Sequence, residues 1–138
     1  MLGMKIKIKR RDIFMTKNFD IGKMINSLRE HPEADKIGMI ASHLGIVRGC
    51  SLHSKYKVKG INISFDKDVL NNIISYFKGQ DGIVEVLVEV SDGLLNRGDA
   101  IMAVVVGGDI REHVFPTLTN MVNRIKSEAS KKYEIFEE

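Results

Sequence analysis

The residue types that most often bind metals or act as nucleophiles are sparse in this sequence and are not spaced for either task. Four histidines are present, and no two of them stand at the spacing of metal ligands on a helix (His31, His43, His53 and His113). The lone cysteine, Cys50, could be reactive beside Arg48, but a small, buried or half-buried structural role is favoured. Phosphate-binding loops, dinucleotide-binding glycine patterns, zinc-protease motifs and the hydrolase elbow are absent from the sequence. We therefore expect no metal site and no bound cofactor.

The charge of the chain is mildly positive, with a formal net charge of +3 and a pI of about 9.0. This balance suits an anionic small substrate or an acidic partner, and it falls short of a dedicated nucleic-acid binder. Basic residues cluster at 5–11, but residues 4–9 alternate apolar and basic, which predicts a half-buried strand with a solvated face. No apolar run approaches the roughly 20 residues of a membrane span, and one cysteine cannot form an internal disulfide. We expect a soluble protein of the reducing cytoplasm.

Hydrophobic periodicity predicts one mixed α/β or α+β domain over residues 1–138, in the order strand, helix, strand, strand, helix, strand, strand, helix. The expected ranges are strands at 4–9, 36–47, 58–65, 83–90 and 100–106, and helices at 20–31, 66–77 and 109–128. The last of these strands is so apolar that burial on both faces is expected, and a bulge or change of face is expected near Gly60. Asp109 and Glu112 have the form of a capping box. Residues 91–98 are expected to form a loop and residues 130–138 a short charged tail.

Two short motifs follow or precede predicted strands. Gly45, Val47 and Arg48 end the second strand and fit the pattern Phe-x-Gly-x-Val-Arg, with His43 at the aromatic position. The sequence Gly-Leu-Leu-Asn-Arg-Gly-Asp at 93–99 fits the turn Gly-x-Leu-x-x-Gly-Asp/Glu and precedes the most apolar strand.

The long predicted helix carries a third motif. Arg111 and Phe115 lie in its first turns and Lys126 lies near its end, as in a His-Arg-x-x-x-Phe helix that closes with Leu-Lys. The three motifs, in this order, resemble the large subunit of molybdopterin synthase from roughly residue 36 to the C-terminus. The resemblance implies a fold of hammerhead type, in which one main sheet with packed helices accompanies a small antiparallel subdomain.

The function implied by this resemblance is sulfur transfer in molybdenum cofactor biosynthesis. The family converts cyclic pyranopterin monophosphate into molybdopterin by adding two sulfurs. The sulfur donor is the thiocarboxylated C-terminal Gly-Gly of a ubiquitin-like small subunit, whose tail threads into a pocket on the large subunit. The implied assembly is a homodimer of large subunits with one small partner at each end, a heterotetramer. Molybdopterin is then the product rather than a bound cofactor.

The resemblance also implies roles for five basic residues: Lys126 and Lys132 as catalytic groups, and Arg48, Arg111 and Lys131 as substrate-binding groups. Arginine suits a cyclic phosphate or a thiocarboxylate because it is always charged and can bond bidentately. Arg48 follows a strand, and Arg111 lies in a first helical turn, where free backbone N–H groups favour anions. Arg111 and Lys126 are about 22 Å apart along one helix. We therefore expect a site that uses both to draw them from two subunits.

Two departures from the family pattern support an alternative. Ile110 stands where the family has histidine, and His113 points to a different side of the helix. Tyr133 stands at the strict position of a second essential lysine, so Lys131 or Lys132 can serve only with a shift of one or two residues. The alternative is a non-catalytic homodimeric relative that binds a phosphorylated small molecule or a Gly-Gly-tailed partner. Tail binding without sulfur transfer would select that alternative.

Overall fold

A mixed five-stranded sheet forms the centre of the molecule in the computed structural model, which describes residues 6–7, 13–15 and 19–137. The strands lie in the order β1 (Ile6–Lys7), β2 (Ile13–Met15), β5 (Ile83–Val90), β7 (Ala100–Gly108) and β3 (Met39–Ile46). All neighbours are antiparallel except β2 and β5, which are parallel. The first predicted strand, at 4–9, is described only over β1, and the rest of it lies outside the described residues. Strand β2 was not predicted.

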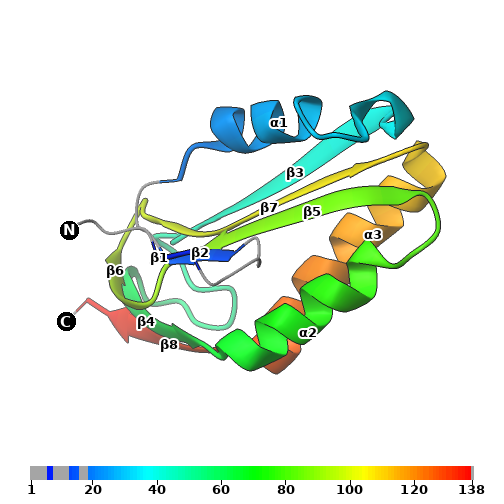
Figure 1. Ribbon diagram of the computed structural model, residues 1–138. Coiled ribbons are helices and arrows are strands. Elements are labelled where there is room, and N and C mark those ends of the chain that lie inside the picture. Colours follow the sequence, from blue (N-terminus) through cyan, green and yellow to red (C-terminus); the bar gives the residue numbers. More distant parts are fainter. Residues whose placement is uncertain (1–5, 8–12, 16–18, 138) are drawn as a thin grey trace.

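Helices cover both faces of this sheet, with α1 (Ile21–Arg29) on one face and α2 (Lys67–Lys78) and α3 (Arg111–Arg124) on the other (Figure 1). Strand β7 lies between β5 and β3 and alternates between two hydrophobic clusters. Val104 and Val106 pack on the side of α2 and α3, whereas Ala103 and Val105 pack against α1. All four are fully buried, which confirms the prediction for this strand. No helix in the described part of the chain is long and apolar enough to cross a membrane.

Three aspartates precede the three helices, and two of them cap a helix. Asp20 accepts a hydrogen bond from the backbone N–H of Lys23, and Asp66 accepts one from that of Val69. The capping box predicted for Asp109 and Glu112 is wrong. The N-cap of α3 is Ile110, and the Asp109 carboxylate contacts the His113 ring at 2.8 Å instead. The hydrogen bond with His113 is the main reason that the pKa of Asp109 lies below its ordinary value.

A second, three-stranded antiparallel sheet packs beside the first, in the order β6 (Gly93–Asn96), β4 (Val58–Phe65) and β8 (Ser130–Phe136). It confirms the small antiparallel part of the expected fold and corrects two of its segments. The predicted loop at 91–98 contains β6, and the predicted tail at 130–138 contains β8. Both strands are short or rich in charge, so their sequences lack a strong alternation, and they form because β4 offers two free edges. The irregularity expected near Gly60 is confirmed by a register shift between Val58 and Gly60.

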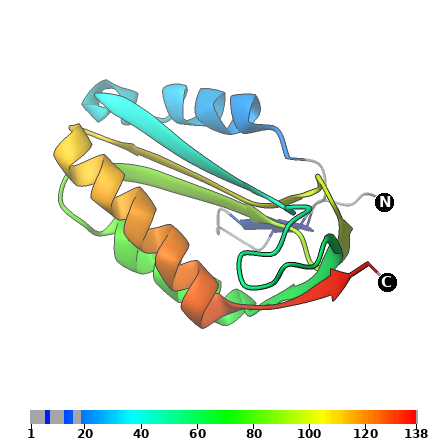
Figure 2. The same ribbon diagram turned by 180° about the vertical axis from the view of Figure 1, so that it is seen from behind.

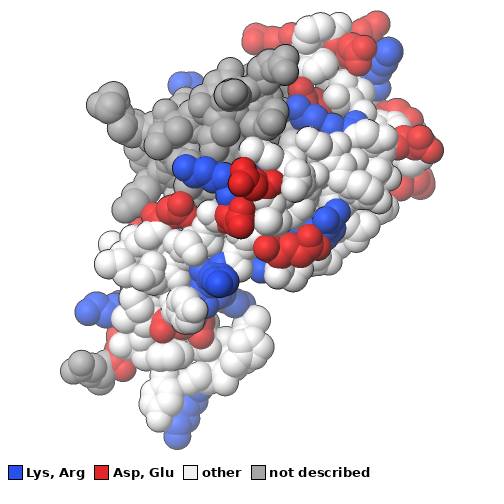
Figure 3. All heavy atoms as spheres, turned by 60° about the horizontal axis from the view of Figure 1, so that its bottom comes forward, with Lys and Arg blue, Asp and Glu red and all other residues white. Residues whose placement is uncertain are grey.

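Charges of both signs are interspersed on the face of the molecule that carries α2. Figure 3 shows lysine and arginine beside aspartate and glutamate there, with uncharged surface between them. Among the described residues in this view, Lys and Arg form no continuous basic stripe of the kind that follows a nucleic-acid backbone.

Gly82, in the turn before β5, packs closely against the start of α3, and replacing it measures how close this packing is. Its φ of +77° disfavours any other residue, and a Cβ atom would collide with the paired side chains of Asp109 and His113. Gly93 has a φ of +96° but nothing within 4 Å of its Cβ position, so it isolates the backbone effect. We expect Gly93→Ala to lower the free energy of unfolding by about 1–2 kcal/mol and Gly82→Ala to lower it clearly more. Urea denaturation measures both, and equal losses would contradict the collision.

Candidate functional site

The two sheets enclose a pocket of about 610 Å³ where they meet. Its walls come from the ends of β3 and β7, the inner faces of β4 and β8, and the chain just after α3. The lining residues are Gly45, Ile46, Val47, Arg48, Leu52, Ile63, Phe65, Ile101, Met102, Ile125, Lys126, Ser130, Lys132 and Glu134. This volume lies within the usual range of small-molecule sites, roughly 300–1,000 Å³.

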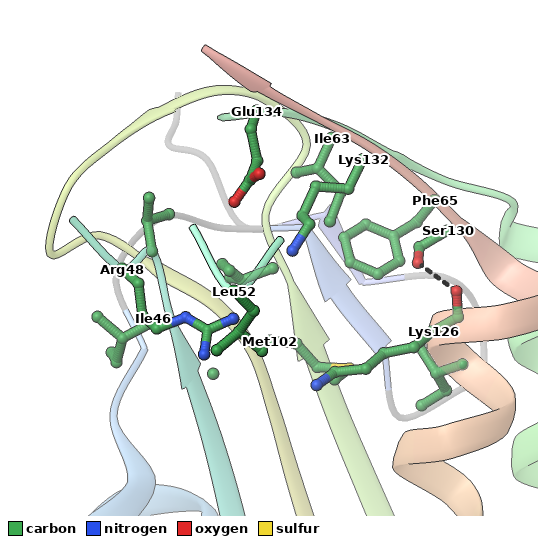
Figure 4. A pocket seen from close by; sticks show the side chains of 14 residues that line it. Ile46, Arg48, Leu52, Ile63, Phe65, Met102, Lys126, Ser130, Lys132 and Glu134 are labelled. Carbon is green, nitrogen blue, oxygen red and sulfur yellow. Dashed lines mark hydrogen bonds between the residues drawn. The ribbon is translucent and has the colours of Figure 1, made fainter. Parts of the chain in front are cut away.

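Three cationic side chains and one carboxylate converge on this pocket (Figure 4). Arg48 reaches in from the end of β3, Lys126 from the end of α3, and Lys132 from β8. Among the described residues, none of these cations forms an ion pair with a carboxylate. The carboxylate of Glu134 accepts a hydrogen bond from the Ser51 hydroxyl at 2.8 Å. Positive charge therefore exceeds negative charge in the pocket, as an anionic ligand requires.

Lys126 is placed by a π-helical turn, Ile125–Ala129, that continues α3. Ile125 and Ala129 are buried and anchor the turn, while Lys126 between them is exposed to the pocket. The Ser130 hydroxyl donates to the Lys126 carbonyl at 3.1 Å, and the backbone N–H of Asp66 donates to the Ala129 carbonyl at 2.8 Å. These bonds satisfy carbonyls that the widened turn leaves open. Such turns occur often at functional sites.

The same turn is fixed from outside by Arg124 and Glu128. The guanidinium donates two hydrogen bonds to the carboxylate, at 2.9 and 3.0 Å, and these hold the pKa of Glu128 below its ordinary value. The Arg124 guanidinium also lies 5.4 Å from the centre of the Tyr76 ring on α2. The backbone that carries Lys126 is thus tied to both helices.

The register of β8 decides which basic residues of the final segment enter the pocket. Lys132 pairs with Ile63 of β4, and both line the pocket. Lys131 precedes Lys132 in the strand, so it points to the opposite face, and it lines neither this pocket nor the hollow beside it. The structure therefore brings Lys132 to Arg48 and Lys126, and it does not bring Lys131 there. Glu134, on the pocket face, was not predicted from the sequence, although strict alternation from Lys132 would have indicated it.

Arg48 owes its position to the turn that forms the second sequence motif. The backbone N–H of Val47 donates to the Asp99 carbonyl, and that of Gly98 donates to the Val47 carbonyl, each at 2.9 Å. Gly98 has a φ of +88°, which only glycine adopts easily. The two motifs, far apart in the sequence, thus form one unit whose effect is to hold the strand end before Arg48.

Arg111 and His113 lie outside this pocket. Arg111 begins α3, and Figure 2 shows the length of that helix between this start and the turn that carries Lys126. It lines a separate, shallow depression with Gly38 and Ile110, and its guanidinium approaches Glu112 at 3.7 Å. The expectation that Arg111 and Lys126 do not share a pocket within one chain agrees with this placement. The prediction for Cys50 is wrong, because its side chain is exposed.

A second hollow of about 390 Å³ extends the pocket along β8. It shares Arg48, Leu52, Lys132 and Glu134 with the first pocket and continues past His53, Tyr133 and Phe136. Together the two hollows form an elongated depression rather than a round cavity. No group of histidine, cysteine, aspartate and glutamate within the described residues is arranged to hold a metal ion.

Comparisons with known proteins identify relatives of this fold. A sequence model of the MoaE protein family matches residues 14–128. A crystal structure of molybdopterin synthase from Staphylococcus aureus is 17% identical with a TM-score of 0.74, over 96% of this chain and 95% of that one. Molybdopterin cofactor biosynthesis protein E from Burkholderia multivorans is 21% identical with a TM-score of 0.72, over 96% and 92% of the two chains. A complex of subunits 1 and 2 of molybdopterin-converting factor from Helicobacter pylori matches at 20% identity and a TM-score of 0.67, over 90% and 83%. No curated protein sequence matches the chain significantly.

Proposed function

The chain belongs to the MoaE protein family, and on that premise we propose that it acts as the large subunit of molybdopterin synthase through the pocket between its two sheets. It takes part in molybdenum cofactor biosynthesis as a sulfurtransferase, converting cyclic pyranopterin monophosphate into molybdopterin. The observation that carries the assignment of the site is the convergence of Arg48, Lys126 and Lys132 on one hollow.

The charges of the pocket fit the two anions that this reaction brings together. The substrate carries a cyclic phosphate, and the sulfur donor ends in a thiocarboxylate. Arg48 can bind a phosphate or carboxylate oxygen pair bidentately, whereas Lys126 and Lys132 act as mobile point charges. Lys126 extends toward the middle of the hollow, beside Met102, which suits a group that contacts the reacting atoms. Apolar side chains such as Ile63 and Phe65 supply a wall for a flat ring system.

The shape of the depression suits a small-subunit tail. A Gly-Gly terminus is narrow and can lie extended, at about 3.3 Å per residue, along the second hollow toward the first. Its carboxyl end would then meet the cationic cluster. The complex of two converting-factor subunits from Helicobacter pylori, a protein of similar fold, supports a partner of this kind.

A dimer of large subunits completes the proposed site. Arg111 is distant from Lys126 within one chain and its side chain is exposed, so a second copy can bring its own Arg111 to this pocket. We place the assembly, a heterotetramer with one small subunit at each end, in the cytoplasm. The proposed reaction needs no resident metal or cofactor.

A reconstituted turnover assay tests this function. The chain is mixed with cyclic pyranopterin monophosphate and a thiocarboxylated small subunit, and molybdopterin is measured. We expect product above a control without the chain. Lys132→Ala should lower the rate at least about tenfold, because a charge-assisted contact is lost. Lys131→Ala is the matched control on the opposite face of β8 and should keep most of the activity.

Two other results would change the assignment. A loss confined to Lys131→Ala would mean that the pocket described here is not where the substrate binds. No product from the unsubstituted chain, with the small subunit still bound, would select the non-catalytic relative. The replacements at Ile110 and Tyr133 are the observations that favour that second candidate.

A further inference from the structure

His43 has a buried ring nitrogen that makes no hydrogen bond to any described residue. It lies in the middle of β3, opposite Val104 of β7, where the motif pattern has an aromatic residue. A phenyl ring at this place would have no polar atom to satisfy, whereas a buried nitrogen without a partner costs free energy. The polar side chain therefore calls for a functional explanation.

The ring nitrogen lies beside the pocket. His43 shares a face of β3 with Ala41, which packs in the core with residues of α3, and with the pocket residue Gly45, two positions further along the strand. A Cβ atom on Gly45 would stand 3.4 Å from His43 Nε2. The imidazole thus lies along the strand against the pocket residue Gly45.

Lys126 is the cation whose positive charge lowers the pKa of His43. Strand β3 packs against α3, and the charge of Lys126 at the end of that helix acts on the His43 ring. The side chain of Lys126 is long, flexible and without an ion pair among the described residues, so its ammonium is available to an acceptor beside the pocket.

We propose that His43 is a positioning residue for Lys126, and that its neutral imidazole accepts a hydrogen bond at Nε2 from the Lys126 ammonium during turnover. The neutral ring with its proton on Nδ1 has a lone pair on Nε2, which is the buried atom. A lysine held by one acceptor loses the rotamer freedom that otherwise spreads its charge over the pocket. This inference rests on the proposed function, because Lys126 is the group assigned to the chemistry there.

The environment of His43 keeps the ring neutral. Burial lowers the pKa of His43, and the positive charge of Lys126 lowers it further. The residues of β7 opposite and diagonal to His43 are Val104 and Met102, and neither has a titratable side chain. Since the pKa lies below the ordinary value of about 6.5, the ring is neutral at pH 7 and takes up a proton only in more acidic solution. Protonation then repels Lys126 and removes the acceptor.

Two substitutions separate this role from a packing role. His43→Gln places an amide oxygen near the position of Nε2, and this oxygen accepts a hydrogen bond but does not titrate. His43→Phe restores the aromatic residue of the motif and removes the acceptor. We expect His43→Phe to lower kcat roughly tenfold with little change in KM. His43→Gln should keep most of kcat. We expect the unsubstituted chain to lose activity on acidification and both variants to lack that loss.

An NMR titration of His43 tests the contact without turnover. Replacing Lys126 by methionine should raise the pKa of His43, because a positive charge that disfavours protonation is removed. No change in that pKa, or a His43→Gln variant as slow as His43→Phe, would overturn the inference. If the unsubstituted chain forms no molybdopterin while the pKa still rises, the proposed function fails and the pairing of His43 with Lys126 stands.

Discussion

Replacing Lys126 by alanine is expected to lower the rate of molybdopterin formation by about 10²–10⁴-fold, the range lost when a positioned catalytic group is removed. The residue lies on an exposed position of the π-helical turn, whose anchors are Ile125 and Ala129, so the fold should persist. Single-turnover kinetics with the thiocarboxylated partner measure the effect on the chemical step. Lys67→Ala is a suitable control, because that lysine is exposed at the start of α2, away from the pocket.

Lys126→Arg distinguishes two possible roles of this side chain, binding an anion and taking part in proton transfer or bonding. Arginine keeps the positive charge but cannot lose its proton in a protein. Partial activity in Lys126→Arg would mean that Lys126 serves mainly to attract and hold an anion. Activity as low as in Lys126→Ala would mean that the amine takes part in proton transfer or bonding. Unchanged activity in Lys126→Ala would contradict the proposed site.

Mixing two inactive variants is expected to restore activity if the site is shared between two large subunits. Lys126→Ala and Arg111→Ala each damage one half of every site. Subunit exchange gives mixed dimers in which one site has both substitutions and the other has neither. With random exchange, half of the dimers are mixed, so about one quarter of the normal activity should return. The measurement is turnover after incubation of the two purified variants together.

The geometry of α3 underlies this expectation. Arg111 and Lys126 stand near opposite ends of the helix and its π-helical extension, and they line different hollows. Mixing Lys126→Ala with Lys132→Ala gives the control, because these two residues line the same pocket in one chain. A mixed dimer would regain an intact site only if the Lys126 and the Lys132 of one site came from different chains. In that control each mixed dimer carries one damaged residue in each pocket, so no recovery is expected. Recovery there, or none with Arg111→Ala, would contradict the shared site.

The sequence predicted the family and most of the regular elements, and the family match confirms the resemblance based on three motifs. Those motifs were informative because they lie at strand and helix ends, where local patterns are strong. The continuous apolar run of β7 and the stripes of α2 and α3 were likewise local signals. The capping box at Asp109 failed because the carboxylate has a competing partner, His113, one helical turn further on.

The choice between Lys131 and Lys132 could not be made from the sequence. Both are exposed lysines in a charged segment, and nothing local shows which face of a strand will be inward. The decision comes from pairing with β4, more than sixty residues earlier in the chain, which places Lys132 opposite Ile63. A one-residue slip would exchange the two faces. The family match ends at residue 128, before β8 begins, so this wall of the pocket lies beyond the matched residues.

The pairing of β8 with β4 links substrate affinity to local stability, because the proposed site is complete only while β8 is docked on β4. In the described part of the chain β8 pairs with β4 alone, as the edge of a three-stranded sheet, and it supplies Ser130, Lys132 and Glu134 to the pocket. An edge strand can detach without unfolding the core, and a detached β8 leaves Arg48 and Lys126 without their facing wall. Only the docked fraction binds, so the apparent dissociation constant rises as docking weakens. Conversely, a ligand bound by Lys132 in the proposed site would stabilise the backbone pairing of β4 with β8, so we expect β8 to detach less often when the pocket is occupied.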